Sequence, residues 1–315
     1  MKRALVTGAS GFVGSHLVPL LHENGFEVWA TWNRYKRKFD FPVRWIHAGL
    51  TESKIALRLV QESRPDYVFH LAGQTSLRFS WSDPGRTLQT NVAATIFLLE
   101  GVVRFAPEAR VVLASSIQVY GQAFTSGRRA SETDHASPLS PYAGSKLLME
   151  LAGMNFVTRH NVSAVIARGS NQVGTGQDAT YAFSNFCRQI AMMERGKQPP
   201  ILEVGNIDVV RDFIHIRDAV RAYVLLARRG KKGEIYNVSV GKGVLLKEGI
   251  QFLQKETKVR FKIKRLSSRF HPNDLPYAVT DSSKLRKLGW QPEASVWQAI
   301  RELLNEWRER VKYGP

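Results

Sequence analysis

The fold of this chain is decided by Thr7-Gly8-Ala9-Ser10-Gly11-Phe12-Val13-Gly14, a glycine-rich stretch near its start. An apolar run over residues 4–7 precedes it and predicts a strand, and the run over residues 11–24 predicts a helix. In this context Gly8 permits a tight turn, Gly11 lets the backbone approach a pyrophosphate, and Gly14 lets the helix pack closely on the strand. The phosphates would meet the free N–H groups at the helix N-terminus. The stretch therefore predicts a dinucleotide-binding loop, and a glycine turn without a ligand is the alternative.

The first half of the chain continues this alternation of strand runs and helical runs, which is typical of a parallel sheet with helices on both faces. We therefore predict an α/β fold, a doubly wound Rossmann-type parallel sheet with a smaller α/β substrate-binding region. The nucleotide-binding domain should span residues 1–168, with segments of about residues 207–240 returning to it, and residues 169–315 should form mainly the interleaved substrate-binding region. Strands are expected at residues 4–7, 27–31, 44–47, 67–71, 110–114 and 164–167, and helices at 11–24, 52–63, 87–105 and 141–159.

The bulk properties exclude several classes of protein. The 315 residues are 43% hydrophobic, which suffices for a large core, and the single cysteine, Cys187, lies in an apolar helical pattern that predicts a buried thiol. One cysteine allows no internal disulfide, and no apolar run approaches the ~20 residues that a membrane span needs. Because the N-terminus enters a strand at once, we expect no signal peptide and a cytoplasmic location.

The net charge of +18 raises the question of a nucleic-acid partner, because basic surfaces bind phosphate non-specifically. The basic residues are scattered in short clusters, without zinc-ligand spacing, an RNA-binding signature or a long basic arm. We therefore expect a solvated basic surface that helps to attract anionic substrates, with no metal and no specific nucleic acid. A nucleic-acid binder is the alternative.

The end of the second predicted strand distinguishes NAD from NADP. An acidic residue there would bind the adenosine ribose and repel a 2′-phosphate. Residues 30–38 contain no carboxylate. Thr31, Asn33 and Arg34 could instead hold a 2′-phosphate, so the sequence predicts NADP(H), with NAD(H) still possible. The alternative is that some of the cations in this run are ordinary surface residues.

A tyrosine and a lysine four residues apart open the helical run that starts at residue 141. At this spacing Tyr142 and Lys146 lie one turn apart on the same helix face. The ammonium group could lower the pKa of the phenol toward the working range of a general acid or base. An exposed tyrosine and an exposed lysine are the alternative, but the glycine loop supplies a place for a nicotinamide cofactor beside them.

Together these stretches resemble the extended short-chain dehydrogenase/reductase family, and within it the nucleotide-sugar-modifying members. The resemblance covers nearly the whole chain and depends on a combination of motifs that are each weak alone. Besides the glycine loop, the motifs lie at residues 66–72, 90–92, 114–116, 140–146, 211–218 and 236–238.

The resemblance implies a role for each matching residue. Ser116 would hydrogen-bond a sugar carbonyl, Tyr142 would exchange a proton with its oxygen, and Lys146 would bind the nicotinamide ribose. Asn171 and Arg211 would hold the diphosphate-sugar, with a salt bridge of Arg211 to Asp212 or Asp218 as the alternative. Asn91 would support the site, and Ser115, Gln118 and His271 would bind the substrate. The remaining residues would bind the cofactor: Gly8, Ser10, Gly11, Phe12, Val13, Gly14, Leu71, Ala72 and Gly73.

Position 118 separates the activities within this family. The related dehydratases carry a glutamate or an acidic pair in this segment, whereas this chain has Gln118. Dehydration across C5–C6 needs a base and an acid, and an amide can act as neither. The resemblance therefore implies NADPH-dependent reduction of the 4-keto group of a nucleotide-diphosphate 4-keto-6-deoxy sugar of the GDP-mannose type. A 4-epimerase or 4,6-dehydratase of the same family and a non-catalytic cofactor-sensing protein are the alternatives.

The helical runs over residues 87–105 and 141–159 carry more apolar residues than one sheet face requires. Family members often pair these helices across a two-fold axis, and two-fold dimers are the commonest oligomers. We therefore expect a homodimer. The alternative is that these apolar residues belong to the core.

Overall fold

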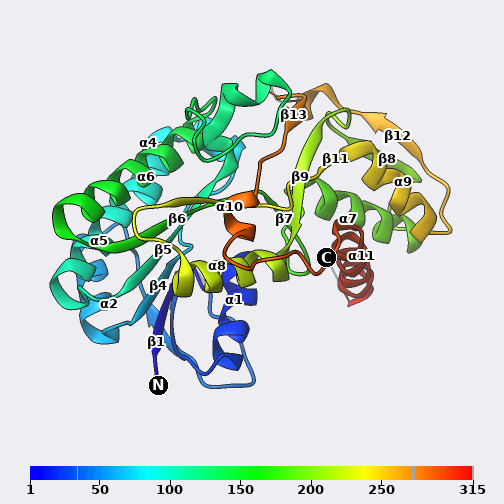
Figure 1. Cartoon of the computed structure of the whole chain (residues 1–315). Coiled ribbons are helices and arrows are strands. Elements are labelled where there is room, and N and C mark those ends of the chain that lie inside the picture. The colour runs from blue at the N-terminus through cyan, green and yellow to red at the C-terminus, as the bar shows by residue number, and fades with distance from the viewer. Residues whose placement is uncertain (34, 271–273, 314–315) are drawn as a thin grey trace.

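The computed structural model describes residues 1–33, 35–270 and 274–313. Its centre is a seven-stranded sheet in the order β10-β6-β5-β4-β1-β2-β3, with every neighbouring pair parallel (Figure 1). The strand order reverses between β1 and β4, where doubly wound sheets open a crevice at the carboxyl ends of their strands. The predicted Rossmann-type α/β fold is confirmed. The strands are β1 (Arg3–Thr7), β2 (Glu27–Trp32), β3 (Arg44–His47), β4 (Tyr67–His70), β5 (Arg110–Ser116), β6 (Ser163–Gly169) and β10 (Ile235–Val238).

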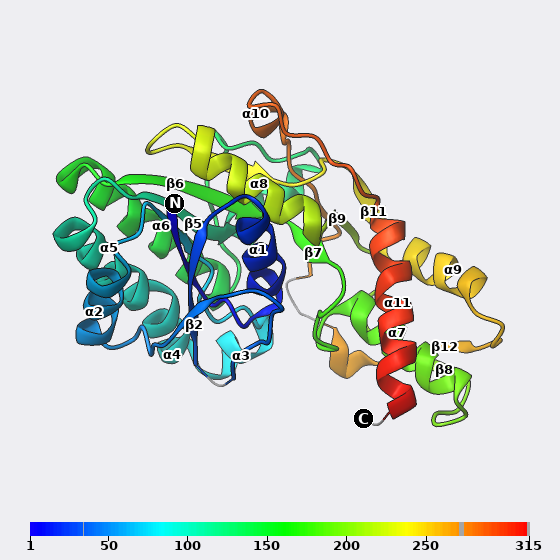
Figure 2. The same cartoon turned by 90° about the horizontal axis from the view of Figure 1, so that it is seen from below.

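Helices cover both faces of this sheet (Figures 1 and 2). One face packs against α1 (Phe12–Glu23) and α8 (Ile216–Arg229), and the other against α2 (Ser53–Ser63), α5 (Ala94–Phe105) and α6 (Pro141–His160). Because neither face meets solvent, consecutive residues of β1 and β6 are buried, as a parallel sheet requires. Both α8 and β10 pack with the sheet although they follow β6 in the chain. The domain boundary at residue 168 stays a prediction.

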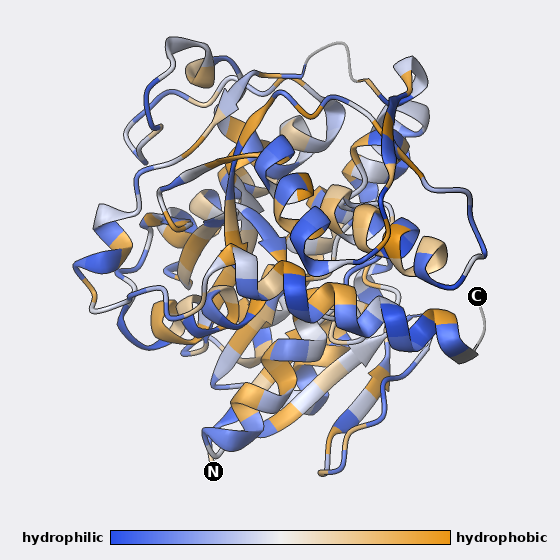
Figure 3. Ribbon diagram, turned by 90° about the vertical axis from the view of Figure 1, so that its right-hand side faces the viewer, coloured by the Kyte–Doolittle hydropathy of each residue, from blue (hydrophilic) through white to orange (hydrophobic). Residues whose placement is uncertain are grey.

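The chain after β6 also builds a smaller second region with its own core (Figure 2). The terminal helix α11 (Val296–Tyr313) shows alternating hydrophilic and hydrophobic bands in Figure 3, and its residues Ala299, Ile300, Leu303 and Leu304 are buried in this core. Cys187 is fully buried here, and burial raises the pKa of its thiol, in agreement with the predicted core position. The other elements of the region are β7 (Asn171–Val173), β8 (Ile201–Val204), β9 (Val210–His215), β11 (Gly243–Leu245), β12 (Lys262–Arg265), β13 (Tyr277–Ala278), α7 (Ala182–Glu194) and α9 (Leu246–Glu256).

The chain predicted as a helix over residues 87–105 is helical throughout, but the type of helix changes along it. The structure divides it into α4 (Pro84–Leu88), a π-helical turn η1 (Gln89–Ala93) and α5. A π turn changes the direction of the side chains it carries and is frequent at functional sites. Here it carries Asn91, a buried residue of the predicted site.

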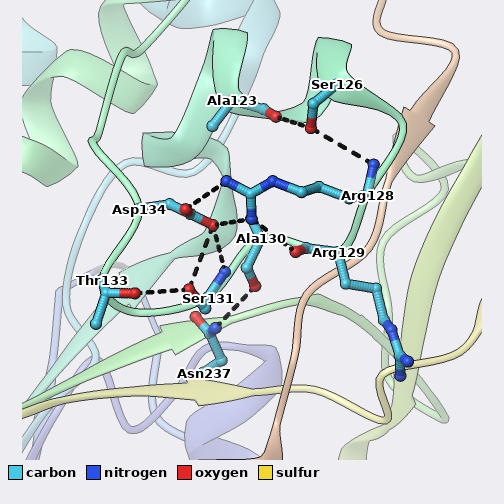
Figure 4. Close-up of polar contacts among 9 residues, drawn as sticks. All are labelled: Ala123, Ser126, Arg128, Arg129, Ala130, Ser131, Thr133, Asp134 and Asn237. Atoms are coloured by element: carbon cyan, nitrogen blue, oxygen red, sulfur yellow. Dashed lines mark hydrogen bonds and ion pairs between the residues drawn. The ribbon is translucent and has the colours of Figure 1, made fainter.

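The loop after η2 (Ile117–Ser126) is fixed by a dense set of polar contacts, shown in Figure 4. The guanidinium group of Arg128 donates to both carboxylate oxygens of Asp134, at 2.8 and 2.6 Å, and the Ser131 N–H donates to Asp134 at 2.7 Å. The Ala130 carbonyl accepts from the Asn237 amide of β10 at 3.3 Å, and Ala130 forms a parallel bridge with Thr280, just after β13. The loop therefore ties the central sheet to the second region.

Three short elements complete the described fold, namely α3 (Leu77–Ser82), η3 (Ser267–Arg269) and α10 (Ser283–Arg286). None of the helices in the described ranges is long and apolar enough to cross a membrane. The same ranges contain no cluster of three His, Cys, Asp or Glu side chains that could hold a metal ion.

Candidate active site

A cleft of about 1020 Å³ opens where the carboxyl ends of β1, β4, β5 and β6 face the second region. It brings together residues that are far apart in the sequence. Arg34 and His271 lie outside the described residues, so their predicted roles stay predictions. All the other cofactor, catalytic and substrate residues predicted from the sequence line the cleft: Gly8, Ser10, Gly11, Phe12, Val13, Gly14, Asn33, Leu71, Ala72, Gly73, Ser115, Ser116, Gln118, Tyr142, Lys146, Asn171 and Arg211.

The glycine loop has the geometry of a phosphate cradle. Gly8 has a φ of +69°, and a Cβ atom there would lie 2.8 Å from the backbone nitrogen of Ala72. A Cβ atom at Gly14 would lie 2.5 Å from the Cα of Ala9, so α1 could not pack as closely on the loop. Within the described chain no side chain caps Gly11, and the first-turn N–H groups of a helix have no intrahelical acceptor. These donors and the helix dipole fit the pyrophosphate of a dinucleotide.

A buried chain of hydrogen bonds holds the loop from below. Thr7 Oγ1 accepts from the Ala72 N–H at 3.1 Å and lies 2.8 Å from His70 Nδ1. His70 Nε2 lies 2.9 Å from Thr95 Oγ1 on α5. Burial lowers the pKa of His70 to about 3, so the ring is neutral. The carboxyl ends of β1 and β4 are thereby fixed side by side where the cofactor would lie.

At the end of β2, Thr31 and Asn33 both line the cleft, but Thr31 is buried and its hydroxyl accepts the Gly8 N–H at 3.0 Å. Thr31 therefore supports the loop, and Asn33 is the exposed polar residue at this end. Arg37 reaches back to the glycine loop, with its Nε donating to the Ser10 carbonyl at 3.0 Å. This contact places one cation of the basic run against the phosphate cradle.

The start of α6 sets the position of the catalytic pair. Ser140 caps the helix by accepting the Ala143 N–H at 3.1 Å, and Pro141 occupies the first turn. Tyr142 and Lys146 therefore lie one turn apart on the buried side of the helix. Ser116, at the end of β5, accepts the Gln118 N–H at 3.2 Å and is hydrogen-bonded to Tyr142. The structure thus brings the predicted serine, tyrosine and lysine together.

The electrostatics of this group differ from the prediction. Burial raises the pKa of Tyr142, and the hydrogen bond with Ser116 offsets the rise only in part. Burial also lowers the pKa of Lys146 to about 8, while its Nζ donates to the Ala114 carbonyl at 2.8 Å. The prediction that Lys146 lowers the pKa of Tyr142 is therefore wrong, because loss of water disfavours the phenolate more than any nearby cation favours it. A phenol in this state keeps its proton at neutral pH and can donate it.

Asn91 supports the site through the loop after β4 and through α6. Its Oδ1 accepts the Gln74 N–H at 2.7 Å, and its Nδ2 donates to the Gln74 carbonyl at 3.0 Å and to Ser145 Oγ at 2.8 Å. Ser145 in turn donates to the Tyr142 carbonyl at 2.7 Å. The side chain of Asn91 therefore links Gly73 and its neighbours to the helix turn that carries Tyr142.

On the substrate side, Gln118, Asn171 and Arg211 line both the main cleft and an adjoining cavity of about 400 Å³. Arg211 is mostly buried and donates to Asp274 at 2.6 Å and to the Leu275 carbonyl at 2.7 Å. The alternative salt bridges of Arg211 to Asp212 or Asp218 are wrong, since its acidic partner is Asp274. The predicted contact of Arg211 with a diphosphate stays a prediction.

Two tyrosines of the cleft were missed by the sequence analysis. The Tyr181 hydroxyl, just before α7, lies 3.0 Å from Thr75 Oγ1 in the loop after β4, so the pair joins the two walls. The Tyr223 hydroxyl on α8 accepts from Gln172 Nε2 at 2.7 Å. Both tyrosines lie close enough to Tyr142 to raise its pKa further. No local pattern marks them, because they belong to elements of the second half of the chain.

The protein is a short-chain dehydrogenase/reductase of the extended type, as shown by its fold, its glycine loop and the group of Ser116, Tyr142 and Lys146. A family model described as GDP-mannose 4,6 dehydratase matches residues 5–303. The chain belongs to this family of NAD(P)-dependent nucleotide-sugar enzymes, and the family prediction is confirmed.

Individual relatives agree with this placement. The chain is 33% identical to a GDP-6-deoxy-D-mannose reductase of Pseudomonas aeruginosa over 99% of each chain. It is 26% identical to a GDP-mannose 4,6-dehydratase of Yersinia enterocolitica, over 96% of this chain and 93% of that protein. Among solved structures it is similar to RMD from Pseudomonas aeruginosa complexed with NADPH, with a TM-score of 0.87 and 32% identity over 98% of this chain and 100% of that one. A UDP-glucose 4-epimerase of Thermus thermophilus in complex with NAD has a TM-score of 0.87 and 29% identity, over 97% and 99% of the two chains.

Proposed function

We propose that this protein is an NADPH-dependent reductase that converts the 4-keto group of a nucleotide-diphosphate 4-keto-6-deoxy sugar to a hydroxyl. A substrate of the GDP-4-keto-6-deoxy-mannose type is favoured by the resemblance to the Pseudomonas aeruginosa GDP-6-deoxy-D-mannose reductase. NADPH is favoured by the related structure that contains it and by the absence of a carboxylate in residues 30–38.

One observation carries the choice of reduction over dehydration. Among the described residues that line the main cleft, none is an Asp, Glu, His or Cys. Removal of water across C5–C6 needs a base at one carbon and an acid at the other. In this cleft Tyr142 is placed to exchange a proton with the sugar oxygen, and position 118 carries an amide. The hydroxyls of Tyr181 and Tyr223 contact Thr75 and Gln172 instead. Reduction of a ketone needs one proton, which Tyr142 can supply, so this set of side chains suits reduction better than dehydration.

Each residue of the group then has a defined task. The chemistry that NADPH supplies when bound is a hydride. Tyr142, protonated at neutral pH, donates the proton that the C4 oxygen requires, and the Ser116 hydroxyl orients that oxygen. Lys146 would hold the nicotinamide ribose, and the glycine loop the pyrophosphate. Asn171 and Arg211 would contact the diphosphate-sugar, with Gln118 beside the sugar.

The function is tested by mixing the protein with NADPH and a panel of nucleotide 4-keto-6-deoxy sugars while absorbance at the nicotinamide band is followed. Oxidation of NADPH by one of them is expected, and oxidation by none contradicts the proposal. A 4-epimerase, the closest rival, would retain NAD during purification and turn over without added reductant. A cofactor sensor would bind NADPH but reduce nothing.

Arg37 should contribute to the preference for NADPH, because it belongs to the basic run after β2, where a 2′-phosphate would lie, and its Nε donates to the Ser10 carbonyl of the glycine loop. We expect Arg37→Gln to weaken NADPH binding about 10- to 100-fold, as loss of a charged hydrogen bond would, and to leave NADH binding nearly unchanged. Fluorescence titration with both cofactors measures this. Lys38→Gln, an exposed neighbour, is the matched control. An equal loss for both cofactors would show that Arg37 only shapes the loop.

A homodimer through α6 is also part of the proposal. Leu148 and Leu151 on this helix are 46% and 57% exposed, and Trp81 on the adjacent α3 is 57% exposed. A second copy packed on this face would cover them. We expect wild-type protein to sediment as a dimer and Leu151→Glu as a monomer, while Ile263→Glu, on the exposed strand β12, leaves the dimer intact. A monomeric wild type contradicts this prediction. The cytoplasmic location expected from the sequence remains a proposal alongside it.

A further inference from the structure

A buried carboxylate lies directly beneath the catalytic group. Glu150 follows Lys146 by one turn of α6 and is only 2% exposed. Arg168, at 4% exposure on β6, donates to its two oxygens from Nε at 3.0 Å and from Nη2 at 2.7 Å. The Ser115 hydroxyl donates to the same carboxylate from the end of β5. Ser115 lines the cleft, but its hydroxyl is directed to Glu150, and its predicted contact with substrate stays a prediction.

The arginine continues this network toward two further elements. Its guanidinium lies over the Tyr120 ring of η2, 4.7 Å from the ring centre, and Tyr120 donates to Asn237 of β10 at 2.7 Å. Arg168 Nη1 is buried and has no hydrogen-bond partner among the described residues, so Glu150 and the ring are its principal contacts. Burial works against the charge of Arg168, but the hydrogen bonds and charge of Glu150 outweigh it and raise the pKa of the guanidinium.

Such a pair is costly to bury. The loss of hydration of two buried charges often cancels the energy of their attraction, so a buried ion pair commonly stabilises a protein no more than apolar side chains of the same size. The position of this pair suggests what it does. Through its contacts with Ser115 and Tyr120, the Glu150–Arg168 pair connects β5, η2, α6, β6 and β10. This connection lies next to the elements that carry Ser116, Tyr142 and Lys146.

The pair also sets the charges around Lys146. On α6 the lysine has Tyr142 and Glu150 as titratable neighbours, and on β4 it has His70, which is neutral. On β6 Arg168 forms an ion pair with Glu150, and Glu150 is the member of the pair whose charge acts on Lys146. Burial lowers the pKa of Lys146, and the charge of Glu150 is the influence that opposes this. Among the described residues, the Lys146 Nζ donates to the Ala114 carbonyl at 2.8 Å and to the Met149 sulfur at 3.9 Å.

We infer that Glu150 is a positioning residue of this enzyme, which acts through Ser115, Arg168 and Lys146 without touching the reactants. It clamps the end of β5 to α6, and so fixes the spacing between Ser116 and Tyr142. It also keeps Lys146 protonated at neutral pH for its contact with the cofactor. This role rests on the proposed reductase, but cofactor binding tests it separately.

The test uses full-length protein and three variants. Glu150→Gln alone leaves Arg168 without its counter-charge and is expected to be poorly stable. The double variant Glu150→Gln/Arg168→Gln removes both charges and keeps hydrogen-bonding groups in place, so it is the main probe. The control is Glu194→Gln/Arg308→Gln, which removes an ion pair of the same two-point geometry far from the cleft. Folding is followed by thermal unfolding, and NADPH binding by fluorescence from pH 6 to 10.

In wild type, NADPH binding and kcat/KM should weaken as the pH rises through about 8, where Lys146 loses its proton. In the double variant at positions 150 and 168 this loss should begin at a lower pH, because Glu150 is the charge that raises the pKa of Lys146, whereas Arg168 has no comparable influence on it. The kcat should also fall at the optimum pH with little change in KM for the sugar. The control variant Glu194→Gln/Arg308→Gln should change the unfolding temperature but neither the pH dependence of NADPH binding nor kcat.

If Glu150→Gln/Arg168→Gln folds and keeps the wild-type pH dependence of NADPH binding, the inference that Glu150 acts on Lys146 is overturned. Glu150 would then have a structural role only. This readout needs no sugar. If no keto sugar is reduced by the wild type, the proposed function fails while the pH dependence of cofactor binding still decides the role of Glu150.

Discussion

Tyr142→Phe should lower kcat by about 10²–10⁴ and leave the Kd for NADPH within about twofold of wild type, because general acid assistance contributes on this scale. The substitution removes only the phenolic oxygen, which is hydrogen-bonded to Ser116 at the end of β5. The ring fills the same buried space, so the fold and the cofactor cradle should be unaffected. Single-turnover oxidation of NADPH at saturating sugar measures kcat, and fluorescence titration measures Kd.

The control for this variant is Tyr181→Phe, since Tyr181 lines the same cleft and lies close to Tyr142 but its hydroxyl contacts Thr75. It should keep most of the activity. Near-wild-type turnover of Tyr142→Phe would remove the tyrosine from the mechanism. An equal loss in both variants would show that the cleft needs its tyrosine hydroxyls for hydrogen bonds and not for a proton transfer special to Tyr142.

Gly14→Ala should have the second large effect, on cofactor binding. The new methyl group would lie 2.5 Å from the Cα of Ala9 and 2.6 Å from the Gly8 carbonyl, and both contacts are with backbone that cannot turn aside. The helix must move off the loop, at a cost of about 1–3 kcal/mol, which corresponds to about 5- to 150-fold weaker NADPH binding. Isothermal titration with NADPH measures the change.

Gly144→Ala is the matched control, because a Cβ atom at this helical position meets no described atom within 4 Å. Alanine also has the higher helix propensity. This variant should bind NADPH as wild type does. If Gly14→Ala binds NADPH normally, the cofactor does not lie on the loop of residues 8–14, and the whole orientation of the site is wrong.

Much of this fold and site could be predicted because the signals are local. The spacing of Gly8, Gly11 and Gly14 and the four-residue spacing of Tyr142 and Lys146 are set by turn and helix geometry. The alternation of strand and helical runs likewise indicates a parallel sheet, and the right chain segments then meet at its carboxyl edge.

What could not be predicted depends on contacts between distant segments. Arg37 reaches Ser10 across the turn that follows β2, and Arg211 meets Asp274 rather than an acidic residue near it in the chain. The direction of the Tyr142 pKa was wrong because helical spacing shows a nearby cation but not the depth of burial, which dominates here. Glu150 gave no sequence signal as a partner of Arg168, since nothing local pairs α6 with β6.

The central claim, hydride transfer to C4 of a nucleotide 4-keto-6-deoxy sugar, is tested most directly with NADPH deuterated at the transferring position of the nicotinamide. We expect the product to carry one deuterium at C4 of the sugar, with one NADPH consumed for each sugar reduced, and we expect Tyr142→Phe to form the same labelled product about 10²–10⁴-fold more slowly. A product with no deuterium at C4, or conversion of the sugar without consumption of NADPH, would contradict the account and favour an epimerase.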